Sequence, residues 1–396
     1  MIDTAITAIP VPVAREAPAG IYVHIPFCAH ICPYCDFNTY SGQEALIPAY
    51  VDALIAEMRL TRDRVELSGD APTLFFGGGT PSLLPADQIG RVIGVARDLF
   101  GLTSDAEITI EANPESVDGE YLYALRANGV NRLSLGIQSQ RRAGLQVLGR
   151  GHKAIEAGSA YQAARSAGFN NISLDFIFGW PGQTAKDWDA DLETILDWQP
   201  EHVSLYSLIV EPSTPMASAV QRGILTVVDD DTVADFYEQA AARLSGAGWQ
   251  HYEIANWARE PSLRSRHNLI YWQNGHYFGF GAGAHSHLGT LRGSNVRLTG
   301  SYIEAIQAGR RPLAMAETID TATEMGETMM LGLRLLVDGV SADDFERRHG
   351  ESMTTRYAAQ MERFIEIGML SWHGERLRLT DKGMLLANDI CGEFLP

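Results

Sequence analysis

Short apolar runs alternate with amphipathic segments over the first half of the chain. Six runs are rich in aliphatic, β-branched and aromatic residues, and they occupy residues 21–25, 73–76, 107–110, 132–137, 172–178 and 202–210. Runs of this kind are typical of parallel strands that are buried on both faces. Between them, apolar residues such as Val51, Leu54 and Met58 recur at helical spacing. Six strand–helix units in succession predict an α/β fold, a partial (β/α)6 TIM-like barrel over residues 21–215.

Unusual sequences follow each predicted strand directly. In chain order they are HIPFC, GGGTP, EANPE, GIQS, FGWPGQ and EPSTP. In α/β barrels the chemistry lies at the carboxyl ends of the strands. These sequences therefore predict a functional site at that end of the barrel.

The alternation of short apolar runs and amphipathic segments ends at about Pro215. We expect a helix over 229–247, a strand-like aromatic segment over 249–257 and a glycine-rich stretch over 279–289. From residue 324 onward, helices precede a hairpin over 369–372 and 376–379 and a last helix, which indicates an α+β, winged-helix-like module. The expected division is an extension over 1–20, the barrel over 21–215, a linking and ligand-covering segment over 216–323, and the C-terminal module over 324–396.

Charge and composition exclude several classes of function. Lys and Arg number 31 against 49 Asp and Glu, a formal net charge of −18, so the field of the molecule repels polyanions. Residues 324–396 carry 8 basic against 13 acidic side chains, so we expect a structural or partner-docking module and no nucleic-acid binding. Residues 1–20 lack the pattern of a signal peptide, and the chain has no stretch typical of a transmembrane segment. We therefore expect a soluble, cytoplasmic protein.

Three of the four cysteines lie within eight residues. Cys28, Cys32 and Cys35 are spaced C-x3-C-x2-C, and Cys391 is far away in the chain. Three thiolates on one loop can bind three irons of a [4Fe–4S] cluster and leave the fourth iron without a protein ligand. A zinc site would need a fourth ligand from a nearby side chain and fits this spacing poorly. A simple electron carrier usually supplies a fourth cysteine.

This segment resembles the cysteine motif of the radical S-adenosylmethionine (SAM) superfamily, with an aromatic residue, Tyr34, before the last cysteine. The resemblance implies that the amino and carboxylate groups of SAM fill the open iron position and that one-electron reduction cleaves SAM. It also implies that the GGGTP stretch, residues 77–81, receives the methionine end of SAM. Glycines suit that role because they let the backbone approach a ligand closely and offer N–H donors.

Over nearly the whole chain, the sequence is similar to the oxygen-independent coproporphyrinogen III dehydrogenase group and, within it, to heme chaperones of the HemW type. The similarity rests on segments such as YVHIPFC, FFGGGTPSLL, NRLSLGIQS, SLDFIFGWPGQT and GFGAGAHS. It implies two sets of SAM-binding positions. Those for the cluster-bound SAM are Tyr22, Gly78, Glu111 and His285. Those that surround a second SAM in the dehydrogenase are Tyr34, Gly79, Thr80, Gln138, Arg150 and Asp175.

Two features separate the chain from the dehydrogenase. The dehydrogenase motif continues with a further cysteine, whereas Phe37 stands at that position here. An HNxxYW motif supplies His267, Tyr271 and Trp272. Imidazole is a common axial ligand of heme iron and aromatic rings can stack on a macrocycle, but such clusters are also common in packed seams between domains. In the chaperones this segment is associated with heme binding, and His285 and His287 are the second-choice iron ligands.

The preferred hypothesis is a heme chaperone that retains the cluster and SAM and delivers heme to apo-hemoproteins. The alternative is the dehydrogenase, which decarboxylates two propionates of coproporphyrinogen III in heme biosynthesis. A radical SAM enzyme with another substrate is the third hypothesis. An electron donor is expected as a further partner if SAM is cleaved.

Overall fold

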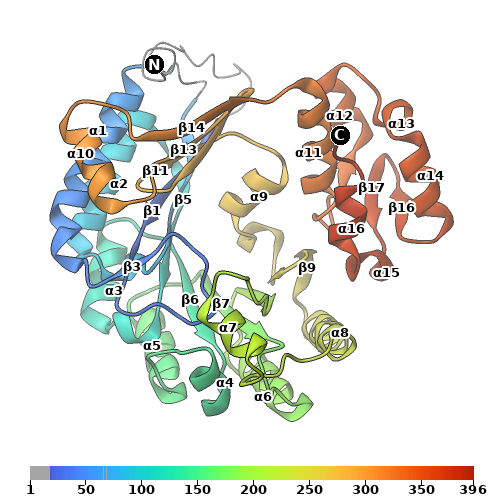
Figure 1. Ribbon diagram of the computed structural model, residues 1–396, viewed down its shortest axis with the longest axis horizontal. Helices are drawn as coiled ribbons and strands as arrows, with labels where there is room; N and C mark the ends of the chain where they lie inside the picture. The colour runs from blue at the N-terminus through green and yellow to red at the C-terminus, as the bar shows by residue number, and fades with distance from the viewer. Residues whose placement is uncertain (1–17, 66, 68) are drawn as a thin grey trace.

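The computed structural model describes residues 18–65, 67 and 69–396 (Figure 1). Most of the predicted extension over 1–20 lies outside these residues. Six strands run parallel and pair in chain order, which confirms the predicted barrel wall. They are β1 (Gly20–Ile25), β4 (Ala71–Gly78), β5 (Leu102–Ala112), β6 (Arg132–Gln138), β7 (Ile172–Phe178) and β8 (His202–Ser207). The last strand ends at Ser207, three residues before the apolar run does.

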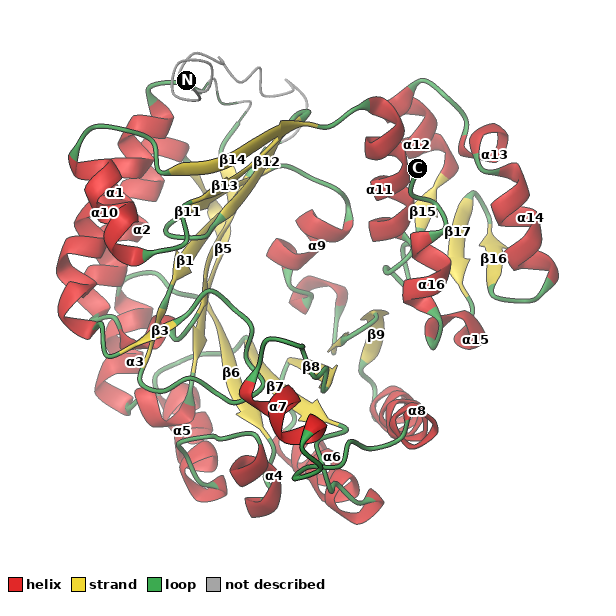
Figure 2. Cartoon of the chain, viewed as in Figure 1, coloured by secondary structure: helices red, strands yellow, loops and turns green. Residues whose placement is uncertain are grey.

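Helices cover the outer face of this sheet (Figure 2). They include α1 (Ile47–Arg62), α2 (Ala86–Phe100), α3 (Gly119–Ala127), α5 (Ala154–Ser166), α6 (Ala185–Trp198) and α8 (Asp230–Gly246), with the shorter α4 (Arg142–Val147) and α7 (Pro215–Gln221) beside them. The apolar residues at helical spacing face the strands, and Val51, Leu54 and Met58 of α1 are fully buried. Helix and strand side chains together form one continuous core, so burial of apolar surface holds the barrel wall together.

Both edges of the parallel sheet are extended by strands from the second half of the chain. β11 (Tyr277–Phe280) pairs parallel to β1 and is followed by the antiparallel β12 (His285–Leu288), β13 (Leu291–Asn295) and β14 (Leu313–Thr318). At the other edge β10 (Asn256–Ala258) and β9 (Gln250–Glu253) form a hairpin beside β8. The glycine-rich stretch is therefore a strand, a turn and a second strand. Over the residues that the structure describes, the sheet has twelve strands with β14 and β9 at its ends, so the barrel is partial, as predicted.

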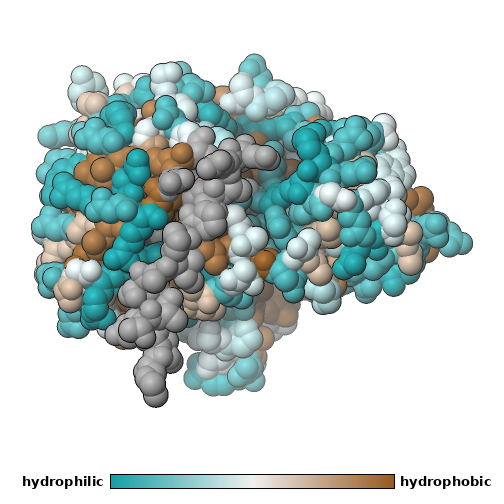
Figure 3. All heavy atoms as spheres, turned by 90° about the horizontal axis from the view of Figure 1, so that it is seen from above, coloured by the Kyte–Doolittle hydropathy of each residue, from teal (hydrophilic) through white to brown (hydrophobic). Residues whose placement is uncertain are grey.

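A second apolar core lies in the C-terminal part of the chain, at the right of Figure 1. Its elements begin with α11 (Thr321–Gly332), β15 (Val340–Ser341), α12 (Ala342–His349), α13 (Met353–Arg356) and α14 (Ala358–Glu366). They end with β16 (Leu370–His373), β17 (Arg376–Leu379), α15 (Asp381–Met384) and α16 (Ala387–Gly392). Helices followed by a β16–β17 hairpin match the winged-helix-like expectation. Seen from above, this module presents a mostly hydrophilic surface (Figure 3).

Two further helices connect these parts. α9 (Arg266–Trp272) carries the HNxxYW motif and lies between the sheet and the C-terminal module, while α10 (Thr299–Gln307) packs against α1 (Figure 1). Among the described residues, none of the helices combines the length and apolar character that a bilayer crossing requires.

Candidate functional site

The three clustered cysteines lie on the loop that follows β1, at the carboxyl end of the parallel strands. Cys28 ends the short strand β2 (Phe27–Cys28), which pairs with β3 (Tyr40–Ser41) and closes the base of the loop. Cys28 and Cys32 are buried and Cys35 is partly buried, and all three are free thiols. The backbone N–H of Cys35 donates to the Cys32 carbonyl at 3.1 Å, which turns the loop back on itself. We call residues 28–36 the cysteine loop.

The surroundings of these thiols suit a cationic iron cluster. Burial raises the pKa of Cys28 and of Cys35, and the other sulfurs of the loop add to both effects. Iron offsets that cost because it binds the thiolate directly. The Thr80 hydroxyl lies 3.6 Å from the Cys28 sulfur and donates to it. Within the part of the chain that the structure describes, His, Cys, Asp and Glu side chains form no group of three around a point for one metal ion.

The GGGTP stretch docks directly on the cysteine loop. The backbone N–H of Gly79 donates to the Ile25 carbonyl and that of Thr80 to the Phe27 carbonyl, both at 2.8 Å. A Cβ atom at Gly79 would lie 2.6 Å from the Phe27 carbonyl oxygen and 3.0 Å from the Cys28 sulfur. Glycine is therefore required at position 79 for this close approach. The stretch thus supports the loop as well as bordering a ligand cavity.

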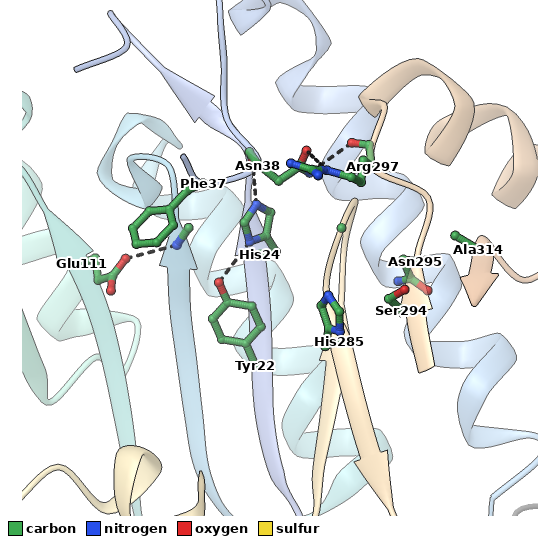
Figure 4. Close-up of a pocket in the computed structure, with 12 residues that line it drawn as sticks. Tyr22, His24, Phe37, Asn38, Glu111, His285, Ser294, Asn295, Arg297 and Ala314 are labelled. Carbon is green, nitrogen blue, oxygen red and sulfur yellow. Dashed lines mark hydrogen bonds between the residues drawn. The ribbon is translucent and has the colours of Figure 1, made fainter. Parts of the chain in front are cut away.

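A cavity of about 480 Å³ opens beside the cysteine loop. Its lining includes all four residues that the resemblance assigned to the cluster-bound SAM: Tyr22, Gly78, Glu111 and His285. These come from β1, the end of β4, β5 and β12, so the sheet brings together positions that lie far apart in sequence (Figure 4). Phe37, directly after the cysteine loop, and Arg297, which follows β13, also line the cavity.

Two acceptor groups face this cavity. Burial, with a smaller effect from the nearby Asp175, raises the pKa of Glu111 to about 8, and Glu111 Oε2 accepts from the Gly78 N–H at 3.1 Å. Burial and the charge of Glu111 raise the pKa of Tyr22. The Tyr22 hydroxyl lies 3.0 Å from His24 Nδ1, and His24 Nε2 lies 2.9 Å from the Asn38 carbonyl oxygen (Figure 4).

The direction of these hydrogen bonds follows from the carbonyl. The Asn38 carbonyl can only accept, so His24 donates from Nε2, accepts at Nδ1, and receives the Tyr22 hydroxyl proton. The Tyr22 oxygen is then left as an acceptor, and the second oxygen of Glu111 becomes one when this carboxyl loses its proton. They suit a ligand that brings an ammonium group or hydroxyl donors, which is the chemistry of SAM.

Of the six positions that match the second SAM, five lie in or near the cysteine loop, and Asp175 lies apart from them. Gly79 and Thr80 contact the cysteine loop, as described above. Tyr34 and Arg150 lie beside Cys32, and Gln138 lies next to Arg150 near Gly136. Gln138 adopts φ 65°, and its Oε1 is buried with no partner among the described residues. Asp175 instead accepts from Ser134 and Ser173 on the inner face of the barrel, at 2.6 and 2.8 Å.

The HNxxYW motif is packed, with its histidine enclosed. His267 is 1% exposed; its Nδ1 bonds to Thr73 Oγ1 and its Nε2 to the Tyr271 hydroxyl, both at 2.8 Å. Burial lowers the pKa of His267 to about 3, so the ring is neutral. In this conformation both ring nitrogens are engaged, and binding of heme iron by His267 would require breaking one of these bonds. Trp272 lies at the seam with the C-terminal module, where Arg334 stands 5.7 Å from its ring centroid.

The two alternative histidines differ in access. His285 is exposed on the cavity wall, whereas His287 is 3% exposed and faces His276, with ring centroids 6.0 Å apart. The polar cavity residues that sequence reasoning did not assign to the site include His24, Asn38 and Arg297. His24 and Asn38 flank the cysteine motif and could have been suspected from it. Arg297 stands in no motif that would have indicated it.

Two family models match parts of this chain. Residues 22–195 match the model of the radical SAM superfamily, and residues 319–386 match that of the HemN C-terminal domain. The chain is 38% identical over 375 residues to the heme chaperone HemW of Bacillus subtilis, covering 94% of this chain and 98% of the relative. Identity to the heme chaperone HemW of Mycobacterium tuberculosis is also 38%, over 96% of this chain and 95% of the relative.

Among solved structures, the coproporphyrinogen III oxidase HemN of Escherichia coli superimposes with a TM-score of 0.83. The match covers 97% of this chain and 92% of that chain at 23% identity, which shows a shared fold. The sequence relatives are similar along nearly their entire length. The chain therefore belongs to the HemW family within the radical SAM superfamily.

Proposed function

We propose that this protein is a heme chaperone that binds heme and delivers it to apo-hemoproteins, with a [4Fe–4S] cluster on Cys28, Cys32 and Cys35 and SAM in the adjoining cavity. The observation that carries the proposal is its 38% identity to proteins named heme chaperone HemW, over almost the whole of both chains. The three thiols, which must stay reduced to bind iron, also favour the cytoplasm as its location.

Several residues in and beside the cavity would contact SAM, each in a different way. Cys28, Cys32 and Cys35 would hold the cluster with one iron free of protein ligands for the amino and carboxylate groups of SAM, and the cluster would supply reductive cleavage of SAM with an electron from an external donor. Tyr22 and Glu111 accept hydrogen bonds from the ligand, and Gly78 lets the backbone approach it. Because burial raises the pKa of Glu111 to about 8, a cationic ligand group beside it would favour loss of its proton.

Phe37 favours the chaperone over the dehydrogenase. Its ring is 67% exposed on the cavity wall, beside the cysteine loop, where the dehydrogenase motif carries a further cysteine. A phenyl ring offers no thiol for a proton, electron or hydrogen-atom step. It does offer an apolar face on which a flat macrocycle could rest.

We place His285 ahead of His267 as the axial ligand of heme, which assigns His285 to heme and leaves Tyr22, Gly78 and Glu111 to hold SAM. The His285 imidazole is exposed on the cavity wall, and burial lowers its pKa, which favours the neutral form that binds iron. Arg297 lies on the same wall and could pair with a heme propionate. His267 would then support this wall indirectly, through its stacking on Phe75 and Tyr22.

The test combines heme titration with an anaerobic assay for coproporphyrinogen decarboxylation on cluster-loaded protein. We expect heme binding without sustained decarboxylation. His285→Ala should weaken heme binding by at least about tenfold, whereas the matched control His373→Ala, an exposed histidine on β16, should not change it. Multiple turnovers to protoporphyrinogen would contradict the proposal. Loss of heme binding in His267→Ala alone, with its fold intact, would return the ligand role to the HNxxYW motif.

A further inference from the structure

A short loop after α4, residues 149–152, makes three contacts with the cysteine loop. His30 Nε2 donates to the Gly149 carbonyl at 3.0 Å. Gly149 adopts φ 62° and packs against Pro33, so closely that a Cβ atom at position 149 would lie 2.5 Å from Pro33 Cδ. Arg150 Nη1 lies 3.6 Å from the Cys32 sulfur and donates to it. We call residues 149–152 the clamp.

The guanidinium of Arg150 is held in place from the other side. Its Nη2 donates to Asn113 Oδ1 and, at 3.3 Å, to the Gly136 carbonyl. The next anchor is His152, whose Nε2 lies 3.1 Å from the Ile137 carbonyl oxygen and whose Nδ1 lies 3.0 Å from Glu115 Oε2. The clamp is thereby fixed to the ends of β5 and β6, so the positive charge beside Cys32 has little freedom to move away.

A fixed positive charge at this point acts on the cluster. A [4Fe–4S] core with three thiolate ligands becomes one unit more negative when it accepts an electron. A cation beside one of the thiolates therefore stabilises the reduced form more than the oxidised form, and the low dielectric of a largely buried site strengthens that preference. Hydrogen bonds to cluster sulfurs act in the same direction.

We propose that Arg150 is a positioning residue for the cluster: it orients the Cys32 thiolate and raises the reduction potential, while Gly149 allows the clamp to close on Pro33. This role concerns the cluster and does not depend on whether heme is the cargo. It also differs from the SAM-binding role that the resemblance assigns to Arg150, because it acts on the cluster in the absence of SAM.

The potential is measured by dithionite titration of SAM-free, cluster-loaded protein, followed by electron paramagnetic resonance. Arg150→Met should disfavour reduction at least tenfold, which moves the midpoint to a value about 59 mV more negative. Arg150→Lys keeps the charge and should shift the midpoint less. The control Arg91→Met removes an exposed arginine that pairs with Asp52 on the outer helices, and it should leave the midpoint unchanged.

The outcomes of this experiment either support or overturn the proposed role of Arg150. An unchanged midpoint in Arg150→Met would overturn the proposal, and so would a Lys variant whose midpoint is as negative as that of the Met variant. If Arg150→Met takes up no cluster while Arg150→Lys does, the result supports a charge that holds Cys32 in place. A change in SAM affinity alone, at a constant midpoint, would assign Arg150 to SAM instead.

The closing of the clamp is tested by a pair of glycine variants. Gly149→Ala and Gly168→Ala both place a side chain at positive φ, 62° and 89°, but only position 149 faces Pro33, and a Cβ atom at position 168 meets nothing within 4 Å. Both variants therefore carry similar backbone strain. We expect Gly149→Ala to lose its cluster to a chelator severalfold faster than Gly168→Ala. Equal rates in the two variants would show that the contact with Pro33 does not hold the cysteine loop.

Discussion

Glu111 should reduce the stability of the ligand-free protein as pH rises, and Glu111→Gln should remove that effect. Burial, with a contribution from Asp175, raises the pKa of this carboxyl from its ordinary 4.5 to about 8. Between these values the folded chain keeps a proton that the unfolded chain has lost. The folded state therefore loses stability as pH rises through this window. Glutamine cannot ionise, and its carbonyl can still accept from the Gly78 N–H that Glu111 binds at 3.1 Å.

The magnitude follows from the two pKa values. The difference in ionisation between the unfolded and folded chains costs the folded state roughly 1 kcal/mol at pH 5.5 and roughly 4 kcal/mol at pH 8.0. The stability gained by Glu111→Gln should thus grow by about 3 kcal/mol between these pH values. Glu111 borders the cavity, where water can stabilise the carboxylate, so the increase should be about 2–3 kcal/mol.

The assay is urea unfolding of the anaerobic, cluster-loaded protein without SAM, at pH 5.5 and at pH 8.0. The control Glu120→Gln, at an exposed position in the first turn of α3, should change stability equally at the two pH values. SAM should perturb the electron paramagnetic resonance spectrum of the reduced cluster in both proteins. Glu111→Gln should need a roughly tenfold higher SAM concentration than the native protein, because the variant lacks the charged acceptor. A stability gain in Glu111→Gln that stays constant with pH would refute the reasoning.

Three further outcomes are expected. Alanine at any one of the three loop cysteines should abolish the brown cluster chromophore after anaerobic reconstitution, whereas Cys391→Ala, in the C-terminal core, should retain it. Gly79→Ala should reduce cluster content measured as iron per chain, because its Cβ atom would meet the Phe27 carbonyl and the Cys28 sulfur; full iron content would show that this contact relaxes freely. His267→Ala should lower the free energy of unfolding by about 2–4 kcal/mol, since a buried ring and its bonds to Thr73 and Tyr271 are lost; a change below about 1 kcal/mol in urea unfolding would argue against a structural role.

Much of the barrel could be predicted because the signals are local. Each buried parallel strand is a short apolar run. Tyr22, Gly78 and Glu111, which the family resemblance indicated, line one cavity because they lie in or directly after such runs. The edge strands β12–β14 were not predicted, since their residues alternate weakly and include glycines and histidines. Their place in the sheet depends on pairing with β11, which is a long-range contact.

The histidines show the limit of motif reasoning. From the sequence alone, His267 could be either a heme ligand or part of a packed aromatic cluster. The residues that pack against it, Thr73 and Phe75, lie almost two hundred residues earlier in the chain. The same holds for Arg150, whose partner Cys32 is 118 residues away. Such contacts are set by the fold, so no spacing along the chain could have indicated them.

Transfer of heme to an acceptor tests the central claim most directly. Anaerobic, cluster-loaded protein is charged with one equivalent of heme and mixed with increasing amounts of apomyoglobin, and the spectrum of the holo-acceptor is followed in time. A chaperone that hands over its cargo should give complete transfer at a rate that rises with acceptor concentration. Failure to bind heme, or a transfer rate that is independent of the acceptor and equal to simple release, would contradict the account.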